Sequence, residues 1–570
     1  MSHRFPFFTI SLIVLLFTAR VGLSQVENPS KAVDPVDQVF AKWSNTNSPG
    51  CAIAVIQDGK IIHQKGYGMA DLEHDIPIRP SSVFYIGSVS KQFVAACMLL
   101  LDEQGKIKLD EDIRTYIPEF PDYGYTISIR NLIHHTSGIR DNLTLWELIG
   151  RSHLEEIPEE EIFELICRQE QLNFEPGTRY MYSNSCYFLM SIIVERVTGQ
   201  SLREYADEHI FQPLGMKHSI FQDNNRRILK NRAFAYGENP DGSFNSMLMR
   251  FDLVGSGGLY STVEDLYLWD QNFYNNQIGN RGQAFIDDML TNGRFNDGTA
   301  VNYAFALVNG AYKGLSTVSH SGALGGYRAF YLRFPEQKFS VIILGNLESF
   351  VPGLLAEKVA DIYLRDLLQV KEISPTQQAK PKLPTVSLSR KQLTAMTGYY
   401  WNEEEAYSPR IYLSNDTLRY QRAEGNESSL RPIGNRHFIM SDTDEELNVH
   451  FQPTTSGKLM NMVLTIGSDT IATSARYKPY KAENAALSKL TGNYYAPELD
   501  THYQIKVDQN QAWLKLKNQP WHVVTPIKGD LLIHPKVGQL YFHLDQKGVA
   551  SGFYLNSGRV RGIQFQRVKN

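Results

Sequence analysis

The stretch GSVSKQFVAACMLLLDEQG, residues 87–105, decides how the first part of this chain folds. After Lys91 it is apolar almost without interruption as far as Leu101, and it ends at Gly105. Glycine commonly ends a helix, because it adopts the left-handed conformation needed there without strain. The stretch therefore predicts a buried helix. Ser88 and Lys91 stand three residues apart at its start, so their side chains share one face.

This serine and lysine are a candidate catalytic pair. A serine hydroxyl is a poor nucleophile at neutral pH and needs a base. A lysine can be that base when burial favours its neutral amine. The N-terminus of a helix also stabilises developing negative charge. A helix-capping serine beside a surface lysine is the alternative, and the pair alone favours that alternative.

Predicted strands lie on both sides of the predicted helical segments. CAIAVIQDGKIIHQKGYG, residues 51–68, has a strong hairpin signal at Asp58-Gly59. YRAFYLRFPEQKFSVIILGN, residues 327–346, is typical of a second hairpin, and a helix is expected after it, from about Pro352 to Leu368. Strands at both ends with helices between them predict an α+β fold, in which an antiparallel sheet is built from both ends and carries a helical insert.

The C-terminal region contains a repeat. LTAMTGYY begins at Leu393 and LSKLTGNYY begins at Leu487, 94 residues later. GKLMNMVL at Gly457 is followed after 91 residues by GVASGFYL at Gly548. Two small all-β, barrel-like domains are expected here, because closure into a barrel removes free strand edges. Chance similarity between β-rich segments is the alternative.

Five segments are predicted. Residues 1–24 resemble a signal peptide, with His3 and Arg4 before an apolar core and Gly22-Leu23-Ser24 before the cleavage point. An uncleaved membrane anchor is the alternative. The other segments are a first domain at 25–370, a linker at 371–392 and β-domains at 393–482 and 483–570. We expect export to the periplasm or the exterior, with no stable membrane span after cleavage, because no later run of about 18 apolar residues occurs.

Composition excludes several classes of protein. The 570 residues carry 57 basic and 61 acidic side chains, a net charge of -4, and no half is strongly basic. A nucleic-acid partner is therefore not expected. The four cysteines lack CxxC spacing and are expected as buried free thiols. Adjacent His134 and His135 would point to different sides of an element, so neither a metal nor another cofactor is expected.

Two further motifs follow the serine and lysine in the chain. Tyr182-Ser183-Asn184 directly precedes a second apolar helix that ends at Gly199, and a tyrosine there can shuttle a proton. His320-Ser321-Gly322, with Ala323 after it, is the only His-x-Gly in the chain.

Together these motifs resemble the penicillin-recognising serine hydrolases, and most of all the class C β-lactamase-related branch with its D-aminopeptidases, esterases and DD-carboxypeptidases. The resemblance covers about residues 35–365. The segments that carry it are GSVSKQF at 87–93, LIHHTSGI at 132–139, PGTRYMYSN at 176–184, GSGGLYSTVEDL at 255–266 and HSGALGGY at 320–327.

The resemblance implies a role for each residue. Ser88 would attack a carbonyl to form an acyl-enzyme, while Lys91 and Tyr182 would share the proton transfers. Asn184 would contact substrate and orient Lys91. In the third motif, His320 and Gly322 would lie on the substrate side. The backbone N–H groups of Ser88 and Ala323 would form the oxyanion hole.

The third motif departs from the Lys-Thr-Gly usual in β-lactamases. That lysine presents a positive charge to a substrate carboxylate, whereas a histidine is largely neutral near pH 7. Weak or absent β-lactamase activity is therefore expected. Arg328 could replace the lost charge, and a structural role for Arg328 is the alternative.

The sequence thus predicts a serine hydrolase of D-aminopeptidase, carboxypeptidase or esterase type, acting on small amides, peptides or esters, with cell-wall fragments among the candidate substrates. A non-catalytic penicillin-binding-like or cell-wall-binding protein is the alternative. The β-domains are expected either to gate the active site or to bind a wall or carbohydrate partner.

Overall fold

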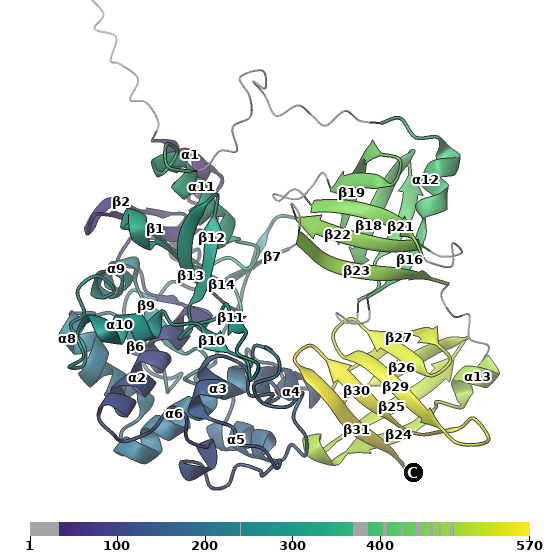
Figure 1. Ribbon diagram of the computed structural model, residues 1–570. Helices are drawn as coiled ribbons and strands as arrows, with labels where there is room; N and C mark the ends of the chain where they lie inside the picture. Colours follow the sequence, from purple (N-terminus) through teal and green to yellow (C-terminus); the bar gives the residue numbers. More distant parts are fainter. Residues whose placement is uncertain are drawn as a thin grey trace, which may run out of the picture.

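The computed structural model describes residues 34–239, 241–368, 386–402, 407–423, 426–440, 447–454, 460–466, 469–478, 480 and 484–569. The predicted signal segment 1–24 and most of the predicted linker 371–392 lie outside these ranges. Figure 1 shows a mixed helix and sheet domain beside two barrels. Among the described residues, no helix combines the length and the apolar character needed to cross a membrane.

The first domain is built on a six-stranded antiparallel sheet in the order β12-β13-β14-β15-β1-β2. The sheet joins both ends of the domain, because β1 pairs with β15 along its whole length, from Cys51 opposite Gly345 to Gln57 opposite Phe339. The predicted α+β fold is confirmed. The strands are β1 Cys51–Gln57, β2 Lys60–Tyr67, β12 Val308–Tyr312, β13 Leu315–Leu324, β14 Tyr327–Phe334 and β15 Phe339–Gly345.

Helices cover both faces of this sheet, which is why β1 and β15 are apolar on both sides. Helix α11 (Pro352–Tyr363) packs on β14 and β15 together with α1 (Pro35–Val39), and α9 (Val263–Asn272) packs on β1 and β15. Asp270 of α9 is fully buried and accepts hydrogen bonds from Tyr331 (2.8 Å), Arg333 (3.0 Å) and Ser340 (2.7 Å) of the sheet. These bonds hold α9 in one register on the strands.

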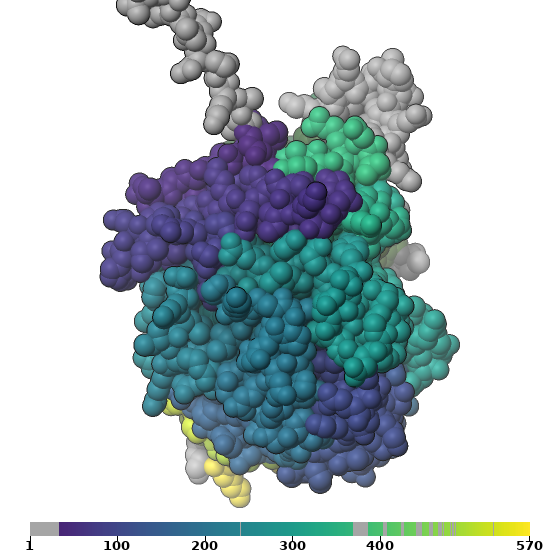
Figure 2. All heavy atoms as spheres, turned by 90° about the vertical axis from the view of Figure 1, so that its left-hand side faces the viewer, coloured from purple at the N-terminus to yellow at the C-terminus, as the bar shows by residue number. Residues whose placement is uncertain are grey.

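The helical insert centres on two packed helices, α2 (Lys91–Glu103) and α6 (Asn184–Thr198). Helix α6 ends at Gly199, as predicted, and this glycine has the left-handed conformation, with a φ of 74°. Shorter helices surround this pair: α3 Ile129–Ile133, α4 Asn142–Leu148, α5 Glu159–Cys167, α7 Leu202–Ala206 and α10 Gln283–Met289. In Figure 2 this domain fills most of the visible face, and yellow atoms of the second barrel show only at its lower edge.

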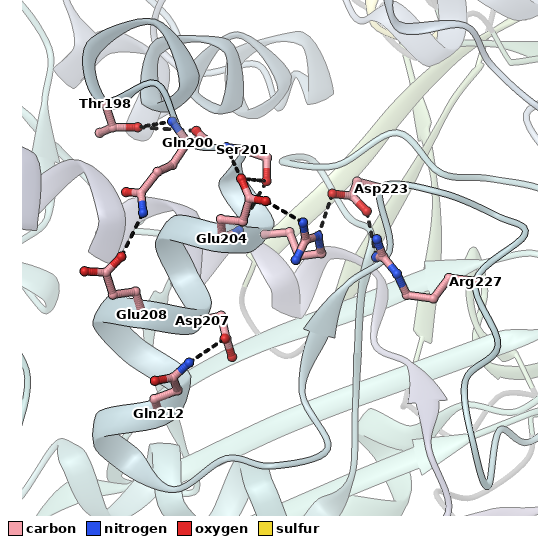
Figure 3. A network of polar contacts seen from close by, with 10 residues as sticks. Thr198, Gln200, Ser201, Glu204, Asp207, Glu208, Gln212, Asp223 and Arg227 are labelled. Atoms are coloured by element: carbon pink, nitrogen blue, oxygen red, sulfur yellow. Dashed lines mark hydrogen bonds and ion pairs between the residues drawn. The ribbon is translucent and has the colours of Figure 1, made fainter.

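A polar network ties the segment after α7 back to that helix (Figure 3). Ser201 and Glu204 form a capping box at the start of α7. Arg203 and Arg227 both donate to the carboxylate of Asp223, at 2.8 and 2.7 Å. The network stabilises the outer edge of the insert.

The C-terminal region forms two closed barrels of eight strands each, which confirms the two predicted barrel-like domains. A short helix precedes each barrel: α12 (Arg390–Met396), which begins inside the predicted linker, and α13 (Asn484–Ser488). The first barrel contains β16 Gly398–Trp401, β17 Arg410–Ser414, β18 Thr417–Ala423, β19 Asn426–Gly434, β20 His437–Met440, β21 Leu447–Pro453, β22 Met460–Ile466 and β23 Asp469–Tyr477. The second contains β24 Gly492–Ala496, β25 Thr501–Asp508, β26 Gln511–Lys515, β27 Trp521–Lys528, β28 Leu531–His534, β29 Gly538–Leu544, β30 Ala550–Ser557 and β31 Val560–Val568.

Both barrels have the same side-chain hydrogen bonds around their first strands. The hydroxyls of Tyr400 and Tyr494 each donate to the carbonyl four residues earlier, at 2.7 Å. The guanidinium groups of Arg476 and Arg567, on the last strands, each donate to the threonine carbonyl directly before the first strand. The repeated sequence therefore corresponds to a repeated atomic arrangement.

The second barrel is docked on the first domain, and its apolar interior belongs to the same hydrophobic core. The hydroxyl of Tyr503 donates to the carbonyl of Leu148 at 2.8 Å, and the Gln519 amide donates to the carbonyl of Gly150 at 2.9 Å. The core of the first barrel is separate.

Candidate active site

Ser88 lies in a short 3₁₀ turn, η2 (Gly87–Ser90), directly before α2. Gly87 has a φ of 56°, which glycine adopts without strain. Ser88 makes no capping hydrogen bond, and the side chain of Lys91 is fully buried. The alternative of a capping serine beside a surface lysine is therefore wrong.

The amine of Lys91 is held by three oxygens. It lies 3.1 Å from Ser88 Oγ and 2.9 Å from Asn184 Oδ1, and it also contacts the carbonyl oxygen of Ser256. Burial holds the pKa of Lys91 well below its ordinary value, and the nearby carboxylate of Asp141 only partly opposes this. A neutral amine can donate to Asn184 and Ser256 while its lone pair accepts the proton of Ser88. Lys91 is thus placed to act as a base.

Tyr182 borders Ser88 and Lys91 just before α6. Its hydroxyl is buried and has no hydrogen-bond partner among the described residues. The centre of its ring lies 4.9 Å from the Lys91 amine and 4.1 Å from the ring of His135. Burial raises the pKa of Tyr182, while the Ser88 side chain and the positive charge of Arg559 act in the opposite direction. The hydroxyl is therefore kept protonated and ready to donate.

Asn184, the first residue of α6, is oriented by Asp141. The Asp141 carboxylate accepts from the Asn184 backbone at 2.7 Å and from its side-chain amide at 2.9 Å. The amide oxygen of Asn184 is consequently directed at Lys91. Asp141 was not predicted from the sequence, because its only local signal is that of an ordinary N-cap residue, for α4.

The His-Ser-Gly motif lies on the half of β13 that is not paired with β12. Strand β12 pairs with β13 only as far as Ser319, and beyond it η2 packs against this edge. Gly325-Gly326 forms a two-residue turn that closes on Leu324 and Tyr327. Hydrogen-bonded and non-bonded pairs alternate along an antiparallel ladder, so the N–H of Ala323 points away from β14.

Gly322 allows this edge to approach Ser88 closely. A Cβ at Gly322 would lie 2.0 Å from the Ile86 carbonyl oxygen and 3.0 Å from the Ser88 backbone nitrogen. A Cβ at Gly87 would lie 2.5 Å from the Ala323 nitrogen. The backbone N–H groups of Ser88 and Ala323 therefore lie close to each other, as an oxyanion hole requires.

His320 is neutral in this environment. Its Nδ1 lies 2.7 Å from the Ser321 carbonyl oxygen, and its Nε2 lies 3.0 Å from the Tyr303 hydroxyl. Burial lowers the pKa of His320 to about 4. The guanidinium of Arg328 donates to the carbonyls of Gly325 and Tyr327, so Arg328 has the structural role rather than the charge-replacing one.

A cavity of about 550 Å³ opens over Ser88. Its charged lining includes Arg559, which comes from the turn between β30 and β31 of the second barrel. Arg559 was not predicted from the sequence, because nothing local connects it to the motifs of the first domain. No three His, Cys, Asp or Glu side chains in the described ranges are grouped to hold a metal ion. The structure brings together all the predicted site residues: Ser88, Lys91, Tyr182, Asn184, His320, Gly322 and Ala323.

This sheet, its helical insert and the serine and lysine at their junction define a β-lactamase/transpeptidase-like fold. Residues 35–363 match the family model described as Beta-lactamase, and the chain belongs to that family.

Known proteins with related sequences and folds agree with this assignment. The chain is similar to a D-aminopeptidase of Gluconobacter oxydans, with 28% identity over 364 residues, 64% of this chain and 65% of that protein. It is 30% identical to a D-aminopeptidase of Brucella anthropi over 303 residues, 53% of this chain and 56% of that protein. The chain thus spans less than two thirds of the length of both. The octameric penicillin-binding protein homologue from Pyrococcus abyssi has the same fold, with a TM-score of 0.53, 19% identity, and coverage of 85% of this chain and 98% of that one.

Proposed function

We propose that this chain hydrolyses small amides, peptides or esters through an acyl-enzyme on Ser88. The observation that carries the proposal is the buried amine of Lys91, 3.1 Å from Ser88 Oγ, with a strongly lowered pKa. A lysine with an ordinary pKa would be protonated at neutral pH and could not accept the serine proton.

The proposed reaction has two halves. Lys91 takes the proton as Ser88 Oγ attacks the carbonyl carbon, and the N–H groups of Ser88 and Ala323 stabilise the oxyanion, each contributing about 3 kcal/mol in the transition state. Lys91 and Tyr182 return the proton to the leaving group, and the carbon–leaving-group bond breaks. Water then hydrolyses the ester on Ser88 with the same residues acting in reverse.

Within this mechanism, D-aminopeptidase, carboxypeptidase and esterase activities are the candidates, and the names of the relatives support the first. Strong β-lactamase activity is not proposed. The pKa of His320 is about 4, so this residue is neutral near pH 7 and supplies no positive charge for a substrate carboxylate.

Labelling of the nucleophile tests this function. A fluorescent fluorophosphonate should modify the wild-type chain at Ser88, and nitrophenyl acetate should be hydrolysed. The Ser88→Ala variant should lose both properties, whereas Ser551→Ala, at an exposed serine of β30, should keep them. Wild-type protein that is neither labelled nor active would instead support a non-catalytic binding protein of this fold.

A further inference from the structure

The turn between β30 and β31 extends from the second barrel into the cavity over Ser88. Its backbone is anchored to the first domain at Arg559. The carbonyl of Arg559 accepts from the Asn173 side chain at 2.9 Å and from the Asp141 backbone at 3.4 Å. The guanidinium carbon lies 4.6 Å from the centre of the Tyr182 ring. Arg559 is therefore held beside the proposed catalytic groups.

The guanidinium of Arg559 has one long ion pair, with the buried carboxylate of Asp141. The nearest carboxylate oxygen, on Asp141, is 3.8 Å away, beyond hydrogen-bond distance. Asp141 is 2% exposed and already accepts four hydrogen bonds, two from Thr144 and two from Asn184. The Arg559 side chain is 46% exposed, and its guanidinium makes no hydrogen bond within the described part of the chain. Its planar donors remain free to bind a carboxylate in bidentate geometry.

Arg559 is also the one fixed cation among the described residues that line this cavity. His320 is neutral, and Arg328 is bound to backbone carbonyls outside the lining. The carboxylate of Glu147 at the rim is paired with His153 at 2.7 Å. The cavity is also lined by the carboxylate of Asp141, so it is the exposed guanidinium of Arg559, and not the cavity as a whole, that favours an anionic substrate group beside it.

We propose that Arg559 recognises a carboxylate in the leaving group of the substrate, so that this chain prefers acyl substrates whose leaving portion ends in a free carboxylate. The inference rests on the proposed function of Ser88. Tyr182 is proposed to pass the proton to the leaving group, and a cation over its ring faces that part of the substrate. The second barrel then supplies the charge that the third motif lacks and is part of the active site.

A matched pair of esters tests this specificity. N-acetyl-D-alanine is esterified with 3-hydroxybenzoate or with 3-hydroxybenzamide, which differ in charge and hardly in size. Wild-type protein should show a kcat/KM about 10- to 100-fold higher for the carboxylate ester, the range expected for a charge-assisted hydrogen bond. Arg559→Gln should bring the ratio of the two kcat/KM values close to one, because the carboxylate ester loses its charged partner.

Two further variants separate charge recognition from structure. Arg559→Lys should keep part of the preference, because its charge remains while bidentate geometry is lost. Lys547→Gln removes one charge from the turn at the opposite end of β30 and should change neither ester.

Three outcomes would overturn the assignment of Arg559. Equal losses with both esters in Arg559→Gln would mean a structural role, and a wild type without preference would mean no carboxylate recognition. Wild-type protein that hydrolyses neither ester would overturn it as well. In that case, fluorophosphonate labelling of Ser88 shows separately whether the proposed hydrolase function survives.

Discussion

Arg140 of the first domain and Glu498 of the second barrel form a buried ion pair, with side chains 0% and 5% exposed. The pair lies at the boundary between the two domains, and Arg140 directly precedes Asp141 in the chain. Gln169 joins it, accepting from Arg140 at 2.9 Å and donating to the Glu498 carbonyl at 3.0 Å. The docking of the second barrel is therefore coupled to the residues that orient Asn184 and Arg559.

We expect Glu498→Gln to destabilise the docked arrangement. It leaves the buried Arg140 charge uncompensated, and breaking a buried pair in this way costs about 3–5 kcal/mol. Thermal unfolding should show a lower midpoint, and the KM for the carboxylate ester should rise. Glu427→Gln disrupts the partly exposed pair with Arg419 in the first barrel and should have little effect. Equal effects of the two variants would contradict the role of the buried pair.

Lys91→Met removes the amine with little change in side-chain volume, and it should abolish most turnover. Removing a positioned general base typically costs 10²- to 10⁴-fold, so we expect kcat to fall about thousandfold with nitrophenyl acetate. Circular dichroism would check that the variant is folded. A folded variant with more than one tenth of wild-type kcat would exclude Lys91 as the base.

The activity should depend on pH through Lys91. Burial holds its pKa well below the ordinary value, so a larger fraction of the amine is neutral and active at a given pH than in an ordinary lysine. As the pH falls through the folded-state pKa, Lys91 gains a proton and can no longer accept one from Ser88. We therefore expect kcat/KM for the neutral benzamide ester to decrease on the acid side, tenfold per pH unit at the limit. A profile without an acid limb would refute this role.

The acid limb should be separable from the titration of His320. The pKa of His320 is about 4, so it stays neutral through the range above pH 5. His320→Gln should accordingly leave the acid limb for the benzamide ester in place, although the level of activity changes. If the limb disappears in His320→Gln, it belongs to the histidine and not to Lys91.

Gly322→Ala should damage the oxyanion site. The new Cβ would lie 2.0 Å from the Ile86 carbonyl oxygen, so β13 must move away from η2 and Ala323 must move from Ser88. Losing one oxyanion donor typically lowers kcat 10²- to 10³-fold, and we expect a loss of that order in single-turnover acylation. Gly310→Ala on exposed β12 meets only Thr317 Oγ1 at 3.3 Å and should stay within about twofold. Matching rates for the two variants would argue against the oxyanion role.

The elements that could be predicted from the sequence are those set by short local patterns of turn and apolar residues. The Asp58-Gly59 turn has positive φ values of 49° and 75°, and the hairpin between β1 and β2 forms where expected. The apolar run after Lys91 forms a buried helix, because helices depend mainly on nearby residues. The start of η2 one turn before α2 was not predicted, since the positive φ of Gly87 serves the approach of β13, a distant strand.

The sequence by itself determined the elements, the two barrels and the chemical identity of Ser88, Lys91 and Tyr182, because turn residues, apolar periodicity and spaced motifs act over short distances. Only the tertiary structure decided that Lys91 is buried and has a lowered pKa, since burial depends on packing from many segments. It also decided which arginine reaches the cavity. Arg328 is next to the third motif but bonds its own turn, whereas Arg559, 471 residues after Ser88, is brought in by the docked barrel.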